Sequence, residues 1–121
     1  MNDKNNEINR LNFEDILWVI FIILSILNIV SNDNQKKYVI SDNQYYEDNA
    51  NKISIFVLIV LLCIYLYFFL RNYNMYTNKG IEATNTDLIK VIGSILFILG
   101  TICLLYFQVN SEDNFIGGPA L

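Results

Sequence analysis

An uncharged apolar block occupies residues 53–70, and no other feature restricts the fold of this chain as strongly. Ser54 is its only ordinary polar side chain, so a helix over the block is apolar on every side instead of along one stripe. At a rise of about 1.5 Å per residue, roughly 20 residues cross a hydrocarbon core about 30 Å thick. Lys52 and Arg71 bracket the block, as expected where a helix enters and leaves lipid. The block predicts a transmembrane helix over residues 53–71.

Two further apolar blocks lie at residues 16–30 and 88–107, separated from the first by stretches dense in Asn, Asp, Lys and Tyr. The later block has the full length of a span, and the earlier one reaches it when the residues from Leu11 onward are counted. We predict transmembrane helices over residues 13–30 and 88–108. The fold class is therefore all-α: an integral membrane protein with three transmembrane helices in a small antiparallel bundle.

An apolar block near the N-terminus is also typical of a secretory signal peptide. Residues 1–15 carry acids as well as Lys4 and Arg10, and no small-x-small cleavage pattern follows Val30. These features favour a retained helix over a cleaved signal.

Two residue pairs have the spacing of a helix N-cap and its reciprocal partner at the third helical position. Asn12 precedes Asp15, and Thr84 precedes Asp87, each pair standing just before an apolar block. Such pairs satisfy backbone N–H groups that have no partner at a helix start. We therefore expect helices to begin near Asn12 and Thr84.

The distribution of Lys and Arg predicts the orientation, because cytoplasmic segments of membrane proteins carry an excess of these residues. One side would hold Lys4, Arg10, Arg71, Lys79 and Lys90, and the other Lys36, Lys37 and Lys52. This bias places residues 1–12 and 72–87 in the cytoplasm and residues 31–52 and 109–121 outside. We expect a multi-pass protein of a cell membrane, of the bacterial plasma membrane in particular, with its N-terminus inside.

The polar segment 31–52 is expected to be an extracellular loop, with a short strand at Tyr38, Val39 and Ile40. Its acids lack the spacing of a calcium-binding loop, so no metal site is predicted there. Residues 109–121 include a Gly-Gly-Pro sequence and are expected to form a flexible tail.

Several chemical functions are disfavoured by what the sequence lacks. The chain contains no His, which is the commonest general base and metal ligand. It has no C-x-x-C, no glycine-rich phosphate loop and no nucleophile elbow. Its net charge of −4, without a basic stripe, argues against nucleic-acid binding. We expect neither an enzyme nor a protein that binds a cofactor, a metal or nucleic acid.

A stand-alone transporter is also unexpected, because transporters usually hold ionisable groups at membrane depth. Glu14, Asp15 and Lys90 lie at the ends of predicted spans, where their charged groups can stay wet. Three helices are few for an alternating-access fold. Cys63 and Cys103 lie inside spans at different depths, so we expect buried apolar thiols without a disulfide between them.

Small residues in the third span recur at seven-residue spacing, Gly93 with Gly100 and Ser94 with Thr101, and so share one helix face. Small residues let helix backbones approach closely, which is a main source of helix association in lipid. This face is our predicted helix-packing surface. It packs either against the other helices of the chain or against another subunit, and both alternatives remain open.

In the first span, Ser25 and Asn28 lie three residues apart and hence on one face. An amide at membrane depth typically bonds to a neighbouring helix. We expect such a packing contact at this pair, and a pore-lining position is the functional alternative.

Residues 87–100, with the sequence DLIKVIGSILFILG, resemble the last span of small uncharacterised membrane proteins from clostridia and related low-GC bacteria. The abundance of Asn, Ile, Lys and Tyr is typical of an AT-rich genome. The resemblance implies a bacterial membrane location and brings no assigned function.

Two functions remain open. The first is a non-catalytic subunit or regulator of a membrane complex, which contacts its partner subunits through the third span. The second is a homo-oligomeric pore of the holin kind; holins are similar in size and number of spans, but they commonly carry a strongly basic cytoplasmic tail, which this sequence lacks. In both cases the chain lies in a lipid bilayer, and its partners are other membrane protein subunits or copies of itself.

Overall fold

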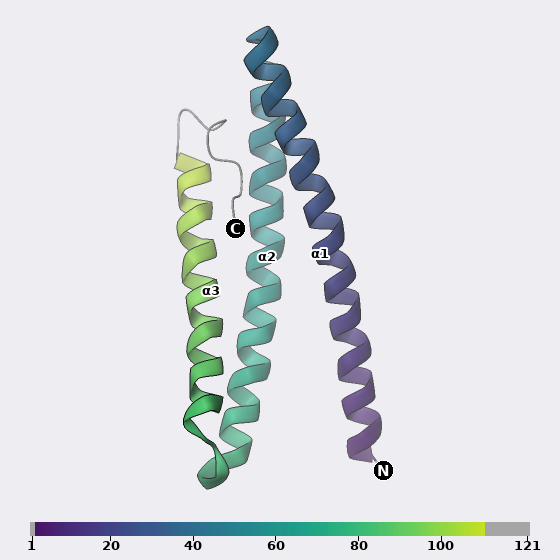
Figure 1. The fold of residues 1–121 in the computed structure, drawn as a ribbon, viewed down its shortest axis with the longest axis vertical. Helices are drawn as coiled ribbons and strands as arrows, with labels where there is room; N and C mark the ends of the chain where they lie inside the picture. The colour runs from purple at the N-terminus through teal and green to yellow at the C-terminus, as the bar shows by residue number, and fades with distance from the viewer. Residues whose placement is uncertain (1, 111–121) are drawn as a thin grey trace.

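The computed structural model describes residues 2–110, and this part of the chain folds into three long helices (Figure 1). They are α1 (Asn2–Ser41), α2 (Gln44–Lys79) and α3 (Asn85–Asn110), with the short 3-10 helix η1 (Gly80–Glu82) before α3. Each long helix contains a stretch long and apolar enough to span a membrane, and no strand occurs within residues 2–110. The prediction of an all-α protein with three membrane-spanning helices is confirmed.

The helices extend well past the predicted spans. The 40 residues of α1 measure about 60 Å at 1.5 Å per residue, about twice the hydrocarbon thickness of a bilayer. Of the expected outer loop, residues 31–52, only Asp42 and Asn43 lie outside a helix. The expected strand at residues 38–40 is wrong because α1 continues to Ser41. The expected tail, residues 109–121, is described only at its first two residues, which end α3, and the rest lies outside the described range.

The connection between α1 and α2 is a two-residue turn. Asp42 has a positive φ of 54°, and its N–H donates to the carbonyl of Tyr38 at 2.7 Å, which closes the last turn of α1. Asn43 then caps α2, because its side-chain oxygen accepts from the backbone N–H of Tyr45 at 3.0 Å. A left-handed residue followed by an N-cap lets the chain reverse without a loop.

The two predicted caps have opposite outcomes. Thr84 and Asp87 exchange the expected bonds: the N–H of Thr84 donates to the Asp87 carboxylate at 3.0 Å, and the N–H of Asp87 donates to the Thr84 hydroxyl at 3.3 Å. The prediction at Asn12 is wrong, since Asn12 lies well inside α1. The acids and amides of residues 2–12 are helical, so no start signal is needed at that position.

Helix α2 lies between the other two helices (Figure 1). It packs on α1 and on α3, whereas no Cα atom of α1 comes within 8 Å of one of α3. The three helices therefore form one layer with α2 in the middle, and the flanks of α1 and α3 do not close on each other.

The buried positions on each helix recur every seven residues, and on α2 the steps between them from Glu47 to Ile64, Leu58 apart, alternate between three and four. The repeat runs through Leu17, Leu24 and Ser31 on α1, Ser54 and Leu61 on α2, and Ser94, Thr101 and Gln108 on α3. A seven-residue repeat is the spacing of antiparallel helices that pack side by side as in a coiled coil. Apolar residues of α1 and α2 form the core, with Val57 and Leu58 fully buried.

We call these packed, buried faces of the helices the seam, and small and polar side chains occupy it near Lys52. The hydroxyls of Ser31 and Ser54, both fully buried, lie 3.1 Å apart, and Ser31 also donates to the carbonyl of Ala50 at 3.2 Å. On the other side of α2, the amide of Gln108 donates to Asn51 at 2.9 Å. Helix–helix hydrogen bonds thus join α2 to both neighbours at one end of the apolar region.

Candidate functional site

The structure separates the four predicted packing residues of α3 into two pairs. Ser94 and Thr101 are buried on the face that packs on α2, and their hydroxyls also bond back to carbonyls one turn earlier. Gly93 and Gly100 lie beside this face, and a Cβ atom added at either position would meet no atom within 4 Å. Packing within the chain therefore uses Ser94 and Thr101, and it leaves the two glycines without a close neighbour among residues 2–110.

Ser25 and Asn28 do not form a shared polar site. Ser25 is exposed, and its hydroxyl donates to the carbonyl of Phe21 in its own helix at 3.0 Å. The Oδ1 atom of Asn28 is buried and accepts no hydrogen bond from the described residues. A bond from Asn28 Oδ1 across to another helix of this chain is thus absent from residues 2–110.

The two thiols are free, as predicted, but they are not buried in the protein. Cys63 and Cys103 are both exposed on the surface of the helices. The expectation of burial is wrong because both residues lie off the seven-residue seam.

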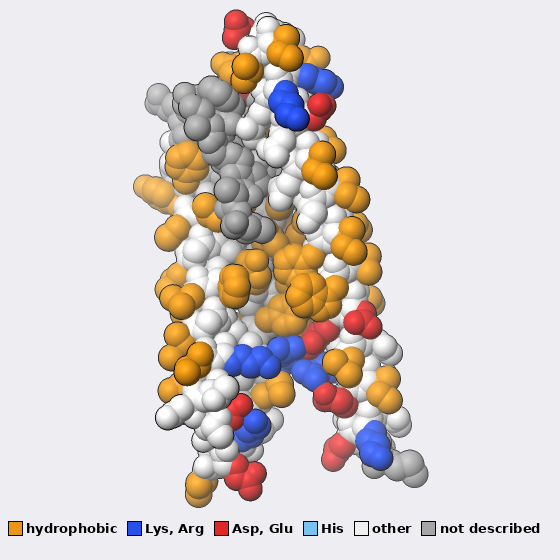
Figure 2. Space-filling model, in the orientation of Figure 1, with side chains coloured by type: hydrophobic (Ala, Val, Ile, Leu, Met, Phe, Trp, Pro, Cys, Tyr) orange, Lys and Arg blue, Asp and Glu red, His pale blue; other side chains and the backbone are white. Residues whose placement is uncertain are grey.

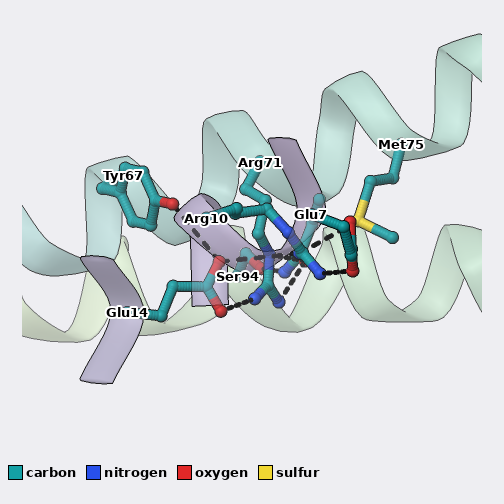
Figure 3. A network of polar contacts seen from close by, with 8 residues as sticks. Glu7, Arg10, Glu14, Tyr67, Arg71, Met75 and Ser94 are labelled. Carbon is teal, nitrogen blue, oxygen red and sulfur yellow. Dashed lines mark hydrogen bonds and ion pairs between the residues drawn. The ribbon is translucent and has the colours of Figure 1, made fainter. Parts of the chain in front are cut away.

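A charged cluster that sequence reasoning missed lies around Glu14 of α1 (Figure 3). Glu14 is only 6% exposed. Its Oε1 atom accepts from Arg71 of α2 at 2.6 Å, and its Oε2 atom accepts from the hydroxyl of Tyr67 at 3.2 Å and lies 3.6 Å from Arg10. A buried carboxylate requires charge and hydrogen-bond partners of this kind, and Glu14 has both.

The cluster continues to α3 through Asn72. Arg71 donates from Nε and Nη2 to the Asn72 side-chain oxygen, at 3.2 and 2.9 Å. The Asn72 amide then donates to the hydroxyl of Ser94 at 2.6 Å. We call Arg10, Glu14, Tyr67, Arg71, Asn72 and Ser94 the Glu14 cluster. Its side chains come from all three helices, so it fixes their relative positions at one end of the apolar region.

Arg10 is held at the edge of the Glu14 cluster. It forms an ion pair with Glu7 and lies 3.8 Å from the sulfur of Met75, as Figure 3 shows. Its Nε atom is buried and has no hydrogen-bond partner among the described residues. One buried guanidinium N–H is therefore unsatisfied there, which is uncommon in folded proteins.

A groove opens next to the Glu14 cluster between α1 and α3, with a volume of about 400 Å³. Five aromatic side chains from the three helices line most of it: Trp18, Phe21, Tyr65, Phe68 and Phe97. The other lining residues are four members of the Glu14 cluster: Glu14, Arg71, Asn72 and Ser94. Figure 2 shows this hollow, with apolar side chains in its middle and charged side chains across its lower end. The groove exists because α1 and α3 pack on α2 without meeting each other.

The Glu14 cluster lies at one boundary of the apolar region. Arg71 and Lys52 bracket the apolar part of α2, and the 19 residues from one to the other correspond to about 28 Å, close to the thickness of a hydrocarbon core. The charges of the Glu14 cluster thus lie at one end of this stretch of membrane-spanning length, and the aromatic part of the groove extends along it.

Comparison with protein-family models, curated proteins and solved structures finds no match for this chain. Within residues 2–110, no group of three His, Cys, Asp or Glu side chains is placed to hold a metal ion. The three helices, each long and apolar enough to span a membrane, indicate a small multi-pass membrane protein.

Proposed function

We propose that this chain is a non-catalytic subunit or regulator of a membrane complex, and that it packs on its partner through α3. The open side of α3 supports this proposal. Only one face of the helix packs on α2, and the buried residues of α3 are Val91, Ser94, Thr101 and Gln108. Gly93 and Gly100 lie outside that contact, where the helix backbone stays accessible to another helix.

The absence of His from the sequence supports a non-catalytic role, since a proton-transfer site would have to rely on other groups. In the Glu14 cluster, the carboxylate is already bonded to Arg71 and Tyr67. These bonds suit a structural contact between helices. The proposed orientation, with the N-terminus inside, follows from the Lys and Arg bias.

Co-purification from native membranes in mild detergent tests the proposal, with Gly100→Leu as the variant. Because a Cβ atom at this position would meet no atom within 4 Å, we expect the helicity and thermal stability of the purified variant to stay unchanged. The amount of co-purifying partner should fall strongly. Ser25→Leu adds the same side chain at an exposed position on α1 and serves as the matched control. Equal partner recovery from the two variants would contradict docking through α3.

A homo-oligomeric pore of the holin kind is the alternative. The Oδ1 atom of Asn28 favours it, because it accepts no hydrogen bond from residues 2–110 and a neighbouring copy could supply a donor. Expression of the chain alone distinguishes the two proposals. Loss of membrane potential on expression would overturn the subunit proposal, whereas a monomer in detergent with no effect on the potential would overturn the pore.

A further inference from the structure

We infer that the groove between α1 and α3 binds one anionic phospholipid, with the phosphate at Arg71 and an acyl chain along the aromatic residues. This site goes beyond the proposed docking of a partner on α3. It uses a different surface, formed by all three helices together.

The groove has the polarity of a lipid along the membrane normal. Its charged end lies at the headgroup level, at Glu14 and Arg71. Phe21 lies seven residues along α1 from Glu14, and Tyr65 six residues along α2 from Arg71, so the aromatic lining reaches about 10 Å into the hydrocarbon region. A volume of about 400 Å³ falls within the range of small-ligand sites, roughly 300–1,000 Å³. A single amphiphile, with its headgroup at the charged end and its acyl chain along the aromatic lining, matches both parts of the groove.

The charge at the mouth favours an anionic headgroup. The charged residues that line the groove and the adjoining cavity are Arg71, Lys79, Lys90, Glu14 and Asp87, which leaves a net charge of +1, three basic groups minus two acidic ones. Lys90 lines the adjoining cavity together with Asn72, and it forms no ion pair with residues 2–110. Lys79 and Asp87, also in that cavity, pair with each other at 3.0 Å and cancel. Basic pockets between transmembrane helices are typical sites for anionic lipid headgroups.

Arg71 has donors left for a phosphate. A guanidinium carries five N–H groups, and Arg71 uses three bonds on Glu14 and Asn72. Its side chain remains 18% exposed and lines the groove. Arg71 also lies over the ring of Phe68, with 5.0 Å between the guanidinium carbon and the ring centroid. These contacts hold the guanidinium at the junction between the charged and aromatic parts, where a phosphate ester would lie.

A transmembrane helix of a partner fits the same groove less well. Such a helix is apolar along its length and has no anionic group to pair with the basic end of the groove. A phospholipid supplies an anion at that level and a hydrocarbon chain below it. We therefore assign the groove to a lipid.

Trp18 provides the probe, because it is the only Trp of the chain and lines the groove. The full chain is reconstituted in phosphatidylcholine vesicles that contain a small fraction of brominated phosphatidylglycerol or of brominated phosphatidylcholine with the same acyl chains. Bromine quenches Trp fluorescence on contact. We expect phosphatidylglycerol to bind about fivefold more tightly than phosphatidylcholine, as one basic contact near a membrane surface implies.

Two variants that break the same ion pair should have opposite effects on lipid preference. Arg71→Gln removes the phosphate partner, and the preference should fall to about one. Glu14→Gln leaves Arg71 charged and removes the competing carboxylate, so the preference should rise above the wild-type value. Lys52→Gln removes a charge at the opposite boundary of the apolar region and should leave the preference unchanged.

Three results would contradict lipid binding in the groove. Equal quenching by the two brominated lipids in the wild-type chain would overturn it, as would the absence of quenching by either lipid, which would indicate that a protein surface covers Trp18. A change of the same sign in both variants would mean that Glu14 and Arg71 act only on helix packing. If Arg71→Gln loses its helicity, the Glu14→Gln result alone decides, because that variant keeps the phosphate partner.

Discussion

Replacement of Arg71 with leucine leaves the Glu14 carboxylate without its closest positive partner. The two groups are 2.6 Å apart, and Glu14 is only 6% exposed. Removal of one partner from a fully buried ion pair typically costs roughly 3–5 kcal/mol. Arg10 still lies 3.6 Å from the carboxylate, and the Arg71 side chain is 18% exposed, so the loss here should be smaller. We expect a decrease of about 2–3 kcal/mol in the free energy of unfolding.

The free energy is measured by titrating detergent micelles that hold the folded chain with sodium dodecyl sulfate, with helicity followed by circular dichroism. Glu14→Gln and the double variant Glu14→Gln/Arg71→Leu complete a double-mutant cycle. Because the double variant has no unpaired carboxylate, its loss should be smaller than the sum of the single losses by about 1–2 kcal/mol. Lys52→Leu is the matched control, since Lys52 is exposed and should change stability by less than about 0.5 kcal/mol.

Two results would refute this reasoning. An Arg71→Leu loss no greater than that of Lys52→Leu would show that the Glu14 carboxylate is solvated in the membrane protein. Additive losses in the cycle would show that Glu14 and Arg71 act independently of each other.

Three further predictions address packing, the thiols and orientation. Ser54→Leu should lower the free energy of unfolding by about 1–3 kcal/mol in the same titration, because Ser54 is fully buried against α1. Ser25→Leu should have little effect, because Ser25 is exposed. Equal losses in the two variants would contradict the packing of α1 on α2 at Ser54. Cys63 and Cys103 should both react with a hydrophobic maleimide in detergent and form no intrachain disulfide on oxidation, as mass spectrometry would show. In a chain without other cysteines, Gln44→Cys should react with an impermeant maleimide added outside intact cells, and labelling only after lysis would reverse the proposed orientation.

The spans could be predicted from the sequence because their signal is local. Residues 53–70 are uncharged throughout, and nothing beyond the block is needed to identify it. The Thr84 cap was equally accessible, since its partner Asp87 stands three residues away. Such features need no knowledge of which helices are neighbours.

The Glu14 cluster could not be found in that way. Glu14 and Arg71 are 57 residues apart, and each stands at the end of an apolar block, where a charge is already explained by the headgroup region. Only the packing of α1 on α2 brings them together. Hydropathy also hides the packing faces, because a helix that is apolar all round shows no stripe.

The parts of α1 and α2 that lie within residues 31–52 had a signal in the sequence, a seven-residue repeat, that a hydropathy profile does not detect. The positions Leu17, Leu24, Ser31 and Tyr38 on α1 keep one seven-residue register across the end of the apolar block. Asn and Asp have low helix propensity, so local reasoning predicts a loop in residues 31–52. Packing overrides this preference, as the buried side chains of Asn34, Glu47 and Ala50 show. On α3 the same register adds Gln108 to Ser94 and Thr101.

The two-residue turn at Asp42 and Asn43 makes the end of the α1–α2 hairpin a rigid spacer. From Lys52, at the boundary of the apolar region, helix continues to Gln44 and carries the turn about 12 Å farther, without a flexible joint. Seven added residues in each helix would raise the turn by about 10 Å and keep the same faces together, whereas a single added residue would rotate the turn by about 100° relative to the seam. Anything that contacts Asp42 therefore does so at a height and in a direction set by helix length.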